Sequence, residues 1–143
     1  MRLVIDSDRL VAGILKDSIS RRIILNERFE FYSPDYLVIE VKKHEEYLAR
    51  KGKLGPGEFE IILDALLDNI ILVSYRGFED ALEEAIDILR NVDVTDAPFL
   101  AVGMALGLDG IWTEDKHFLE QNRLKVYGTE DLSSSVSGKQ TQR

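Results

Sequence analysis

Residues 93–118 read DVTDAPFLAVGMALGLDGIWTEDKHF, and this stretch decides the fold. An aspartate precedes a run of small and apolar residues that is apolar on every side, which is typical of a helix buried inside a protein. Gly107 and Gly110 bracket the end of this helix, and residues 111–113, which read IWT, predict a strand directly after it. A buried helix that leads into a short apolar strand indicates one unit of a parallel α/β sheet.

The rest of the chain repeats this alternation of strands and helices. Apolar segments predict further strands at residues 3–5, 29–32, 70–73 and, at an edge, 124–127. Apolar residues at helical spacing predict helices over residues 7–15, from Ser18 to about residue 24, and over 35–50, 58–67, 78–90 and 116–121. We therefore expect a three-layer α/β/α fold with a central parallel sheet of four to five strands, whose pairing order does not follow from the sequence.

The length and the distribution of polar residues predict one domain. A chain of 143 residues fits a single domain with a substantial core, and no internal repeat is visible. We place this domain at residues 1–130. Residues 131–143 are polar and poor in hydrophobic residues, so we expect a disordered C-terminal tail there.

The composition limits which side chains are available for catalysis and metal binding. The chain has no cysteine and two histidines, which leaves carboxylates, hydroxyls and backbone groups as its main reactive groups. The formal net charge of −8 argues against a non-specific nucleic-acid binder, but less against an enzyme that meets phosphate through a divalent cation. Residues 2–6 are too short for a signal peptide, and the longest uncharged run, 97–108, is below the roughly 20 residues of a membrane span. We expect a soluble cytoplasmic protein with no membrane association.

Acidic residues lie where the ligand site of a parallel sheet is expected. One ends the first strand, one lies early in the helix after the second strand, one begins the buried helix, and one follows the fourth strand: Asp6, Glu40, Asp96 and Asp115. Ligands of open parallel sheets bind outside the carboxyl ends of the strands. If the strands before Asp6 and Asp115 are neighbours, which we assume, the four carboxylates meet in one crevice. Their repulsion then requires a hard cation such as Mg²⁺ or Mn²⁺.

Each acid also has an ordinary structural interpretation. Asp6 would serve as a turn residue at the end of a strand, and Glu40 as a solvated helix position. Asp93, Asp96 and Asp115 would serve as helix caps. Only the joint placement of these residues favours a metal site.

Four segments resemble the motifs of the PIN-domain family. They are VIDSD at 4–8, PDYLVIE at 34–40, DVTDAPFLAVGMAL at 93–106 and IWTEDKHF at 111–118, and their order and spacing cover about residues 2–127. The resemblance implies a PIN fold and an Mg²⁺- or Mn²⁺-dependent endoribonuclease that cleaves single-stranded RNA. The sequence is similar to those of the small, VapC-like PIN ribonucleases. This similarity implies a toxin that has a small antitoxin protein as its partner and that forms a homodimer.

The resemblance also assigns residues. It implies that the metal is held, directly or through water, by Asp6, Glu40, Asp96 and Asp115, and that Thr113 hydrogen-bonds near the site. Two positions depart from the family pattern. Asp8 adds a charge to the first motif, and Asp93 adds an acid one helical turn before Asp96. Asp93 is either an additional metal ligand or a plain helix cap.

Basic segments offer an approach path for RNA. Residues 42–53 carry an excess of lysine and arginine, and a second basic group consists of Arg9, Lys16, Arg21 and Arg22. Both are equally compatible with solvated helix faces. Tyr47 would stack on a base or simply pack.

Two other functions remain. A phosphotransfer domain also places aspartates at strand ends, but its nucleophile loop would need Thr or Val where Leu10 stands. A non-catalytic PIN-like scaffold or partner-binding protein would retain the fold with an idle site.

Overall fold

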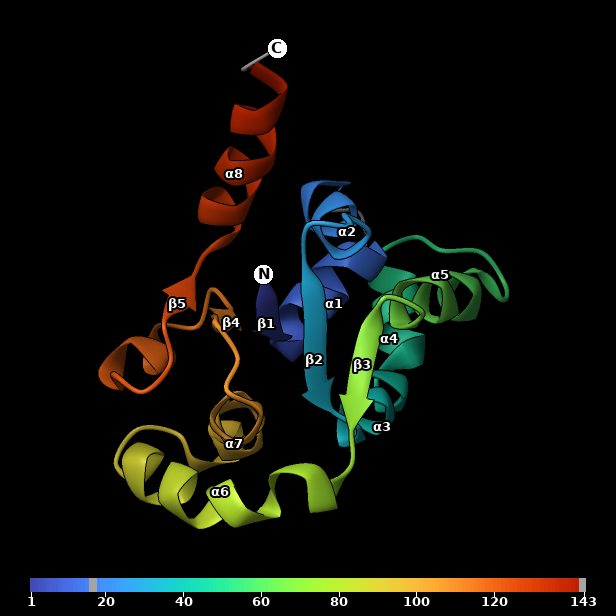
Figure 1. Ribbon diagram of the computed structural model, residues 1–143. Coiled ribbons are helices and arrows are strands. Elements are labelled where there is room, and N and C mark those ends of the chain that lie inside the picture. Colours follow the sequence, from blue (N-terminus) through green and yellow to red (C-terminus); the bar gives the residue numbers. More distant parts are fainter. Residues whose placement is uncertain (16–17, 142–143) are drawn as a thin grey trace.

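The computed structural model describes residues 1–15 and 18–141, and its centre is a five-stranded, all-parallel sheet (Figure 1). The strands follow the spatial order β3-β2-β1-β4-β5. Their bounds are β1 Arg2–Ile5, β2 Glu30–Pro34, β3 Ile70–Val73, β4 Gly110–Trp112 and β5 Val126–Tyr127. The parallel sheet and the edge position of the last strand are confirmed. β1 and β4 are also neighbours, as we assumed from the sequence.

Helices cover both faces of this sheet (Figure 1). The chain moves in one direction from β1 to β3 and then returns to β4 on the other side of β1, so right-handed crossovers place the two sets of helices on opposite faces. One set is α1 Ser7–Leu15, α2 Ser18–Ile24, α3 Tyr36–Lys43, α4 Glu45–Lys51 and α5 Glu58–Leu67, and the other is α6 Tyr75–Leu89 and α7 Ala97–Leu106. The three-layer α/β/α architecture is confirmed. Within the described residues, no helix has the length and apolar character needed to cross a membrane.

The strand order reverses between β1 and β4. The register pairs Leu3 with Gly110 and Ile5 with Trp112, so both strands end at the same level. Crevices at such a reversal, outside the carboxyl ends of the strands, are where open parallel sheets bind ligands. The fold therefore directs attention to the residues immediately after Ile5 and Trp112.

Helix α7 is buried, as its apolar sequence predicts. Six of its ten residues are buried, and Gly103 lies so close to Leu124 that a Cβ would come within 2.3 Å of a Leu124 side-chain carbon. Gly107 ends the helix in the left-handed conformation, with φ 62°, which glycine adopts without strain. This packing fixes the start of α7, and with it Asp96, against the sheet.

Three expected helices differ from the structure in their bounds. The helix expected over 35–50 is divided into α3 and α4 at His44, whose backbone is not helical. No glycine or proline marks this break in the sequence. Helix α6 begins at Tyr75 rather than at residue 78, because Gly77 lies inside the helix instead of ending it. The short helix expected at 116–121 is a 3₁₀ helix, η2, over Lys116–Glu120.

Most of residues 131–143, where we expected disorder, are helical in the structure. Thr129–Thr141 form helix α8, which extends beyond the sheet edge (Figure 1), while residues 142–143 lie outside the described residues. Leu132 is buried, and Arg28 Nη1 donates to the Ser135 carbonyl oxygen at 3.0 Å. One buried leucine and a few polar contacts hold the first turns, a signal too sparse to stand out in a polar segment.

Candidate metal centre

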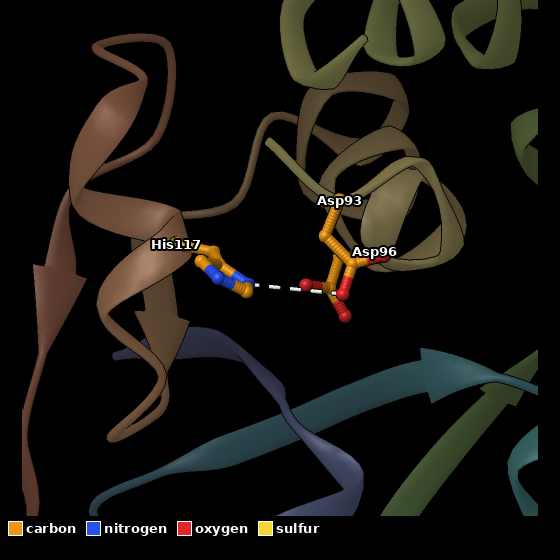
Figure 2. A group of neighbouring side chains, drawn as sticks. All are labelled: Asp93, Asp96 and His117. Carbon is orange, nitrogen blue, oxygen red and sulfur yellow. Dashed lines mark ion pairs between the residues drawn. The ribbon is translucent and has the colours of Figure 1, made fainter. Parts of the chain in front are cut away.

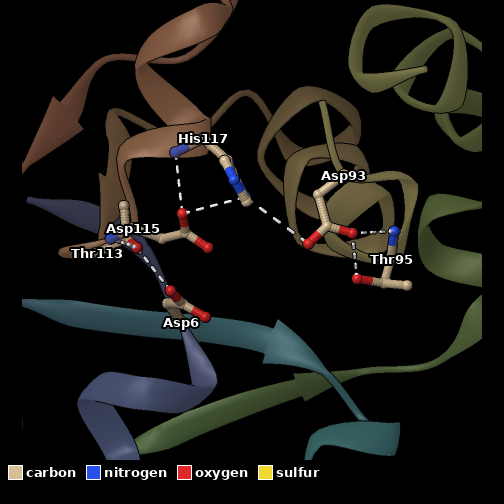
Figure 3. A network of polar contacts seen from close by, with 6 residues as sticks. All are labelled: Asp6, Asp93, Thr95, Thr113, Asp115 and His117. Atoms are coloured by element: carbon tan, nitrogen blue, oxygen red, sulfur yellow. Dashed lines mark hydrogen bonds and ion pairs between the residues drawn. The ribbon is translucent and has the colours of Figure 1, made fainter. Parts of the chain in front are cut away.

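Asp6 and Thr113 are the first residues after the paired ends of β1 and β4. The Thr113 hydroxyl donates to Asp6 Oδ2 at 2.6 Å and accepts the backbone N–H of Asp115 at 2.9 Å (Figure 3). The backbone N–H of Asp6 donates to the Trp112 carbonyl at 3.2 Å, which extends the β1–β4 ladder by one residue. Strand register and one hydroxyl therefore fix Asp6 beside Asp115.

Asp6 lies in the interior, with 4% of its surface exposed. This burial raises the pKa of its carboxyl above the ordinary value, and the charges of Asp8 and Asp115 act in the same direction. The hydrogen bond from Thr113 opposes the rise because it favours the ionised form. Asp6 is thus an acid that is costly to ionise unless a positive charge lies beside it.

Asp96 is a partly buried acid, and one of its carboxylate oxygens has no neighbouring donor in the described part of the chain. It immediately precedes α7, and burial, followed by the charges of Asp93, Asp115 and Asp6, raises its pKa to about 7. Its Oδ2 is buried and has no hydrogen-bond partner among the residues that the structure describes. A buried carboxylate oxygen without a donor is destabilising, and a cation would satisfy it.

Asp93 and Asp115 both act as caps of short 3₁₀ helices. Asp93 Oδ1 accepts the backbone N–H of Thr95 at 3.0 Å at the start of η1, Val94–Asp96, and Asp115 Oδ1 accepts that of His117 at 2.9 Å at the start of η2. The Thr95 side-chain and backbone bonds lower the pKa of Asp93. Both residues therefore make a cap contact through Oδ1, whereas Asp96 makes no side-chain cap bond.

Glu40 reaches the site from the other side of the crevice. It lines a cavity of about 350 Å³ together with Asp96 and Ser7, and the remaining walls are Tyr36, Leu37, Thr95 and Phe99. Its side chain is half exposed and forms an ion pair with Lys43 Nζ at 3.7 Å. Glu40 therefore faces the same space as Asp96 but is held less firmly than Asp6.

Two residues near these acids were not singled out from the sequence. Tyr36 lines the cavity with its ring edge-on to Phe99, and burial, then the charges of Glu40, Asp96 and Asp6, raises its pKa to about 12. Its spacing of four residues from Glu40 on α3 could have indicated a shared helix face.

The second such residue is His117. Its Nδ1 lies 3.3 Å from Asp115 Oδ1 and 3.7 Å from Asp93 Oδ2 (Figure 3). The side chains of Asp93, Asp96 and His117 point toward one another (Figure 2), and one ligand atom from each lies within 4.8 Å of the others. Its position two residues after Asp115 was the only hint in the sequence.

This donor set fits a divalent cation. Acids that follow β1 and β4 and acids at η1 lie together at the carboxyl end of the sheet. Besides burial, the charges of Asp93, Asp115 and Asp6 raise the pKa of Asp96. The buried, unpartnered Asp96 Oδ2 supplies an oxygen that lacks only a positive partner. Oxygen-rich sites of this kind suit Mg²⁺ and Mn²⁺.

The basic segments lie partly outside this centre. Lys42 and Lys43 line a separate cavity of about 590 Å³ with Glu45 and Glu46. In the second group, Arg21 donates to the carbonyls of Gly13 and Ile14, and Arg9 donates to Thr129, so both serve structural bonds. Lys16 lies outside the described residues.

A model of the PIN-domain family matches residues 4–136, which include all four motif segments described above. A search of curated proteins finds no match. The match covers nearly the whole chain and includes Asp6 and Thr113.

Proposed function

The chain belongs to the PIN-domain family, whose members are generally nucleases, and we propose that it is an Mg²⁺- or Mn²⁺-dependent endoribonuclease acting on single-stranded RNA. The observation that carries this proposal is the buried, unpartnered Oδ2 of Asp96 among the charges of Asp6, Asp93 and Asp115. A site that accumulates unmet negative charge at a sheet switch point is suited to a cation and a phosphodiester.

The metal would be held by Asp6, Asp96 and Asp115, with Glu40 facing it across the cavity. When bound, the ion supplies a water of lowered pKa and stabilises the negative charge that develops on the phosphate. Thr113 keeps Asp6 oriented through a 2.6 Å hydrogen bond, and the same hydroxyl holds the Asp115 backbone. The carboxylates are therefore positioned before the reaction begins, which lowers the free energy needed to organise the site.

Tyr36 and Lys43 supply donors on the cavity side. Because the pKa of Tyr36 is about 12, its hydroxyl keeps its proton at neutral pH and is available as a donor to a phosphate oxygen. Lys43 Nζ lies 3.7 Å from Glu40 and contributes a positive charge beside that carboxylate. These groups would allow the protein to contact RNA phosphates although its net charge is negative.

We extend the proposal to a toxin role, with a small antitoxin protein as partner, a homodimeric state and a cytoplasmic location. These points rest on the resemblance to small PIN ribonucleases alone. Light scattering after size-exclusion chromatography tests the dimer, and co-expression with the product of the adjacent reading frame tests the antitoxin. A monomer at micromolar concentration would contradict the homodimer. Growth unaffected by expression of the chain alone would contradict the toxin role.

The decisive experiment is cleavage of a labelled single-stranded RNA in Mg²⁺, Mn²⁺ or EDTA. We expect cleavage with either metal, none in EDTA, and a loss of at least about a hundredfold in Asp6→Asn and Asp96→Asn. Asp64→Asn, on the exposed side of α5, is the matched control and should cleave like the wild type. Equal cleavage by a folded Asp96→Asn protein would reject the mechanism and favour the alternative of a non-catalytic scaffold.

A further inference from the structure

His117 lies between acids that come from separate elements. Its ring approaches Asp115 Oδ1 and Asp93 Oδ2, and Asp93 belongs to the turn before α7 while His117 belongs to η2 (Figure 3). The imidazole side chain is half exposed. The imidazole thus stands at the open rim of the acidic centre.

The carboxylates leave particular atoms for a shared ligand. Asp93 Oδ1 is engaged by both the N–H and the hydroxyl of Thr95, and its other oxygen, Oδ2, is the one nearest the imidazole. Within residues 1–15 and 18–141, Asp96 Oδ2 is buried without a hydrogen-bond partner. With one atom of each of the three side chains within 4.8 Å of the others, small side-chain rotations bring an imidazole nitrogen and two carboxylate oxygens to one ion (Figure 2).

We propose that His117 and Asp93 are additional ligands of this metal centre beside Asp96, and that the His117 nitrogen makes the centre prefer Mn²⁺ to Mg²⁺. Imidazole suits transition metals, whereas Mg²⁺ favours oxygen ligands and water. A centre of carboxylates alone binds both ions through the same oxygens. The added nitrogen therefore selects between them. This inference rests on the proposed function only in taking the crevice as a metal site.

The chain offers a clean test because it has two histidines, His44 and His117. Mn²⁺ bound to the full chain is examined by pulsed electron paramagnetic resonance for coupling to a ligand nitrogen. We expect this coupling in the wild type and in His44→Asn, whose histidine is exposed at the break between α3 and α4, and its loss in His117→Asn. Coupling that survives in His117→Asn would overturn the proposal.

Calorimetric titration supplies a second measurement on the same proteins. We expect His117→Asn to weaken Mn²⁺ binding by at least about tenfold, with Mg²⁺ binding close to that of the wild type. An unchanged ratio of the two affinities would overturn the proposal. Circular dichroism checks that each variant is folded. The resonance spectrum of the wild type tests the proposal even if a variant does not fold. A wild-type Mn²⁺ complex without nitrogen coupling would contradict His117 as a ligand.

The outcomes also separate this inference from the nuclease proposal. A wild-type protein that binds Mn²⁺ through nitrogen but cleaves no RNA supports His117 as a ligand and rejects the nuclease. A protein that cleaves RNA with full activity, but whose bound Mn²⁺ shows no nitrogen coupling, supports the nuclease and rejects His117 as a ligand.

Discussion

Thr113 holds Asp6 through a hydrogen bond of 2.6 Å from its hydroxyl to Oδ2, and these two residues follow the paired ends of β4 and β1. The same hydroxyl accepts the backbone N–H of Asp115. Since Asp6 is almost completely buried, water does not readily replace this donor. One threonine therefore links the architecture of the sheet to the orientation of two acids in the metal centre.

Replacing Thr113 with valine should be costly. The change keeps the shape of the side chain but leaves Asp6 Oδ2 buried without its donor, so we expect a loss of about 1–3 kcal/mol in the free energy of unfolding in the metal-free protein. Thr113→Ser keeps the hydroxyl and should lose less. Urea denaturation measures both, and RNA cleavage by the valine variant should fall by at least about tenfold.

Thr95→Val is the matched control for this comparison. Thr95 also donates to a carboxylate, that of Asp93, but it is exposed, and water can take over its role. We expect its unfolding free energy to change by no more than about 0.5 kcal/mol. Equal losses in Thr113→Val and Thr95→Val would show that burial of the Asp6–Thr113 pair is not what makes it important.

The sequence allowed most of the sheet to be predicted because strands buried on both faces are short apolar runs, and the acids at their ends are visible by position. The approach of Asp6 to Asp115 was not readable, because it depends on the pairing of β1 with β4, which joins residues more than 100 positions apart. His117 and Tyr36 were missed for a related reason. Their importance arises from neighbours on other elements, not from a local pattern.

The pKa of Asp96 predicts how stability depends on pH. Its value of about 7 in the folded chain exceeds the ordinary 3.8, so the folded state binds the proton more tightly than the unfolded state. Stability in EDTA should therefore fall as the pH rises from about 4 to about 7, the interval in which the unfolded state has lost this proton and the folded state retains it. Denaturation midpoints across this range measure the effect.

Asp96→Asn is the variant that tests this assignment. The amide has no charge to bury, so the decline between pH 4 and pH 7 should be smaller than in the wild type. Saturating Mn²⁺ should likewise reduce the decline in the wild type, because a cation favours the ionised carboxylate. A decline as steep in Asp96→Asn as in the wild type would assign it to other groups.

Tyr36→Phe should separate catalysis from stability. The ring packs edge-on against Phe99, and phenylalanine preserves that contact, so the unfolding free energy should change by less than about 1 kcal/mol. Loss of a hydroxyl that faces Glu40 and Asp96 should lower the rate of RNA cleavage by about tenfold. Tyr75→Phe, an exposed tyrosine that packs edge-on against Phe78, is the control and should cleave normally.

Leu132 tests whether α8 belongs to the folded domain. It is 1% exposed in a helix that is otherwise largely polar, and Thr129, three residues earlier, accepts from both Trp112 Nε1 and Arg9 Nη1. Leu132→Ala should therefore lower the free energy of unfolding by about 2–5 kcal/mol, as expected for truncation of a buried leucine. Ser134→Ala, at an exposed position of the same helix, should change it by no more than about 0.5 kcal/mol. Hydrogen exchange at residues 129–135 should accelerate in Leu132→Ala alone, and a Leu132→Ala protein as stable as the wild type would show that the docked first turns of α8 do not stabilise the sheet.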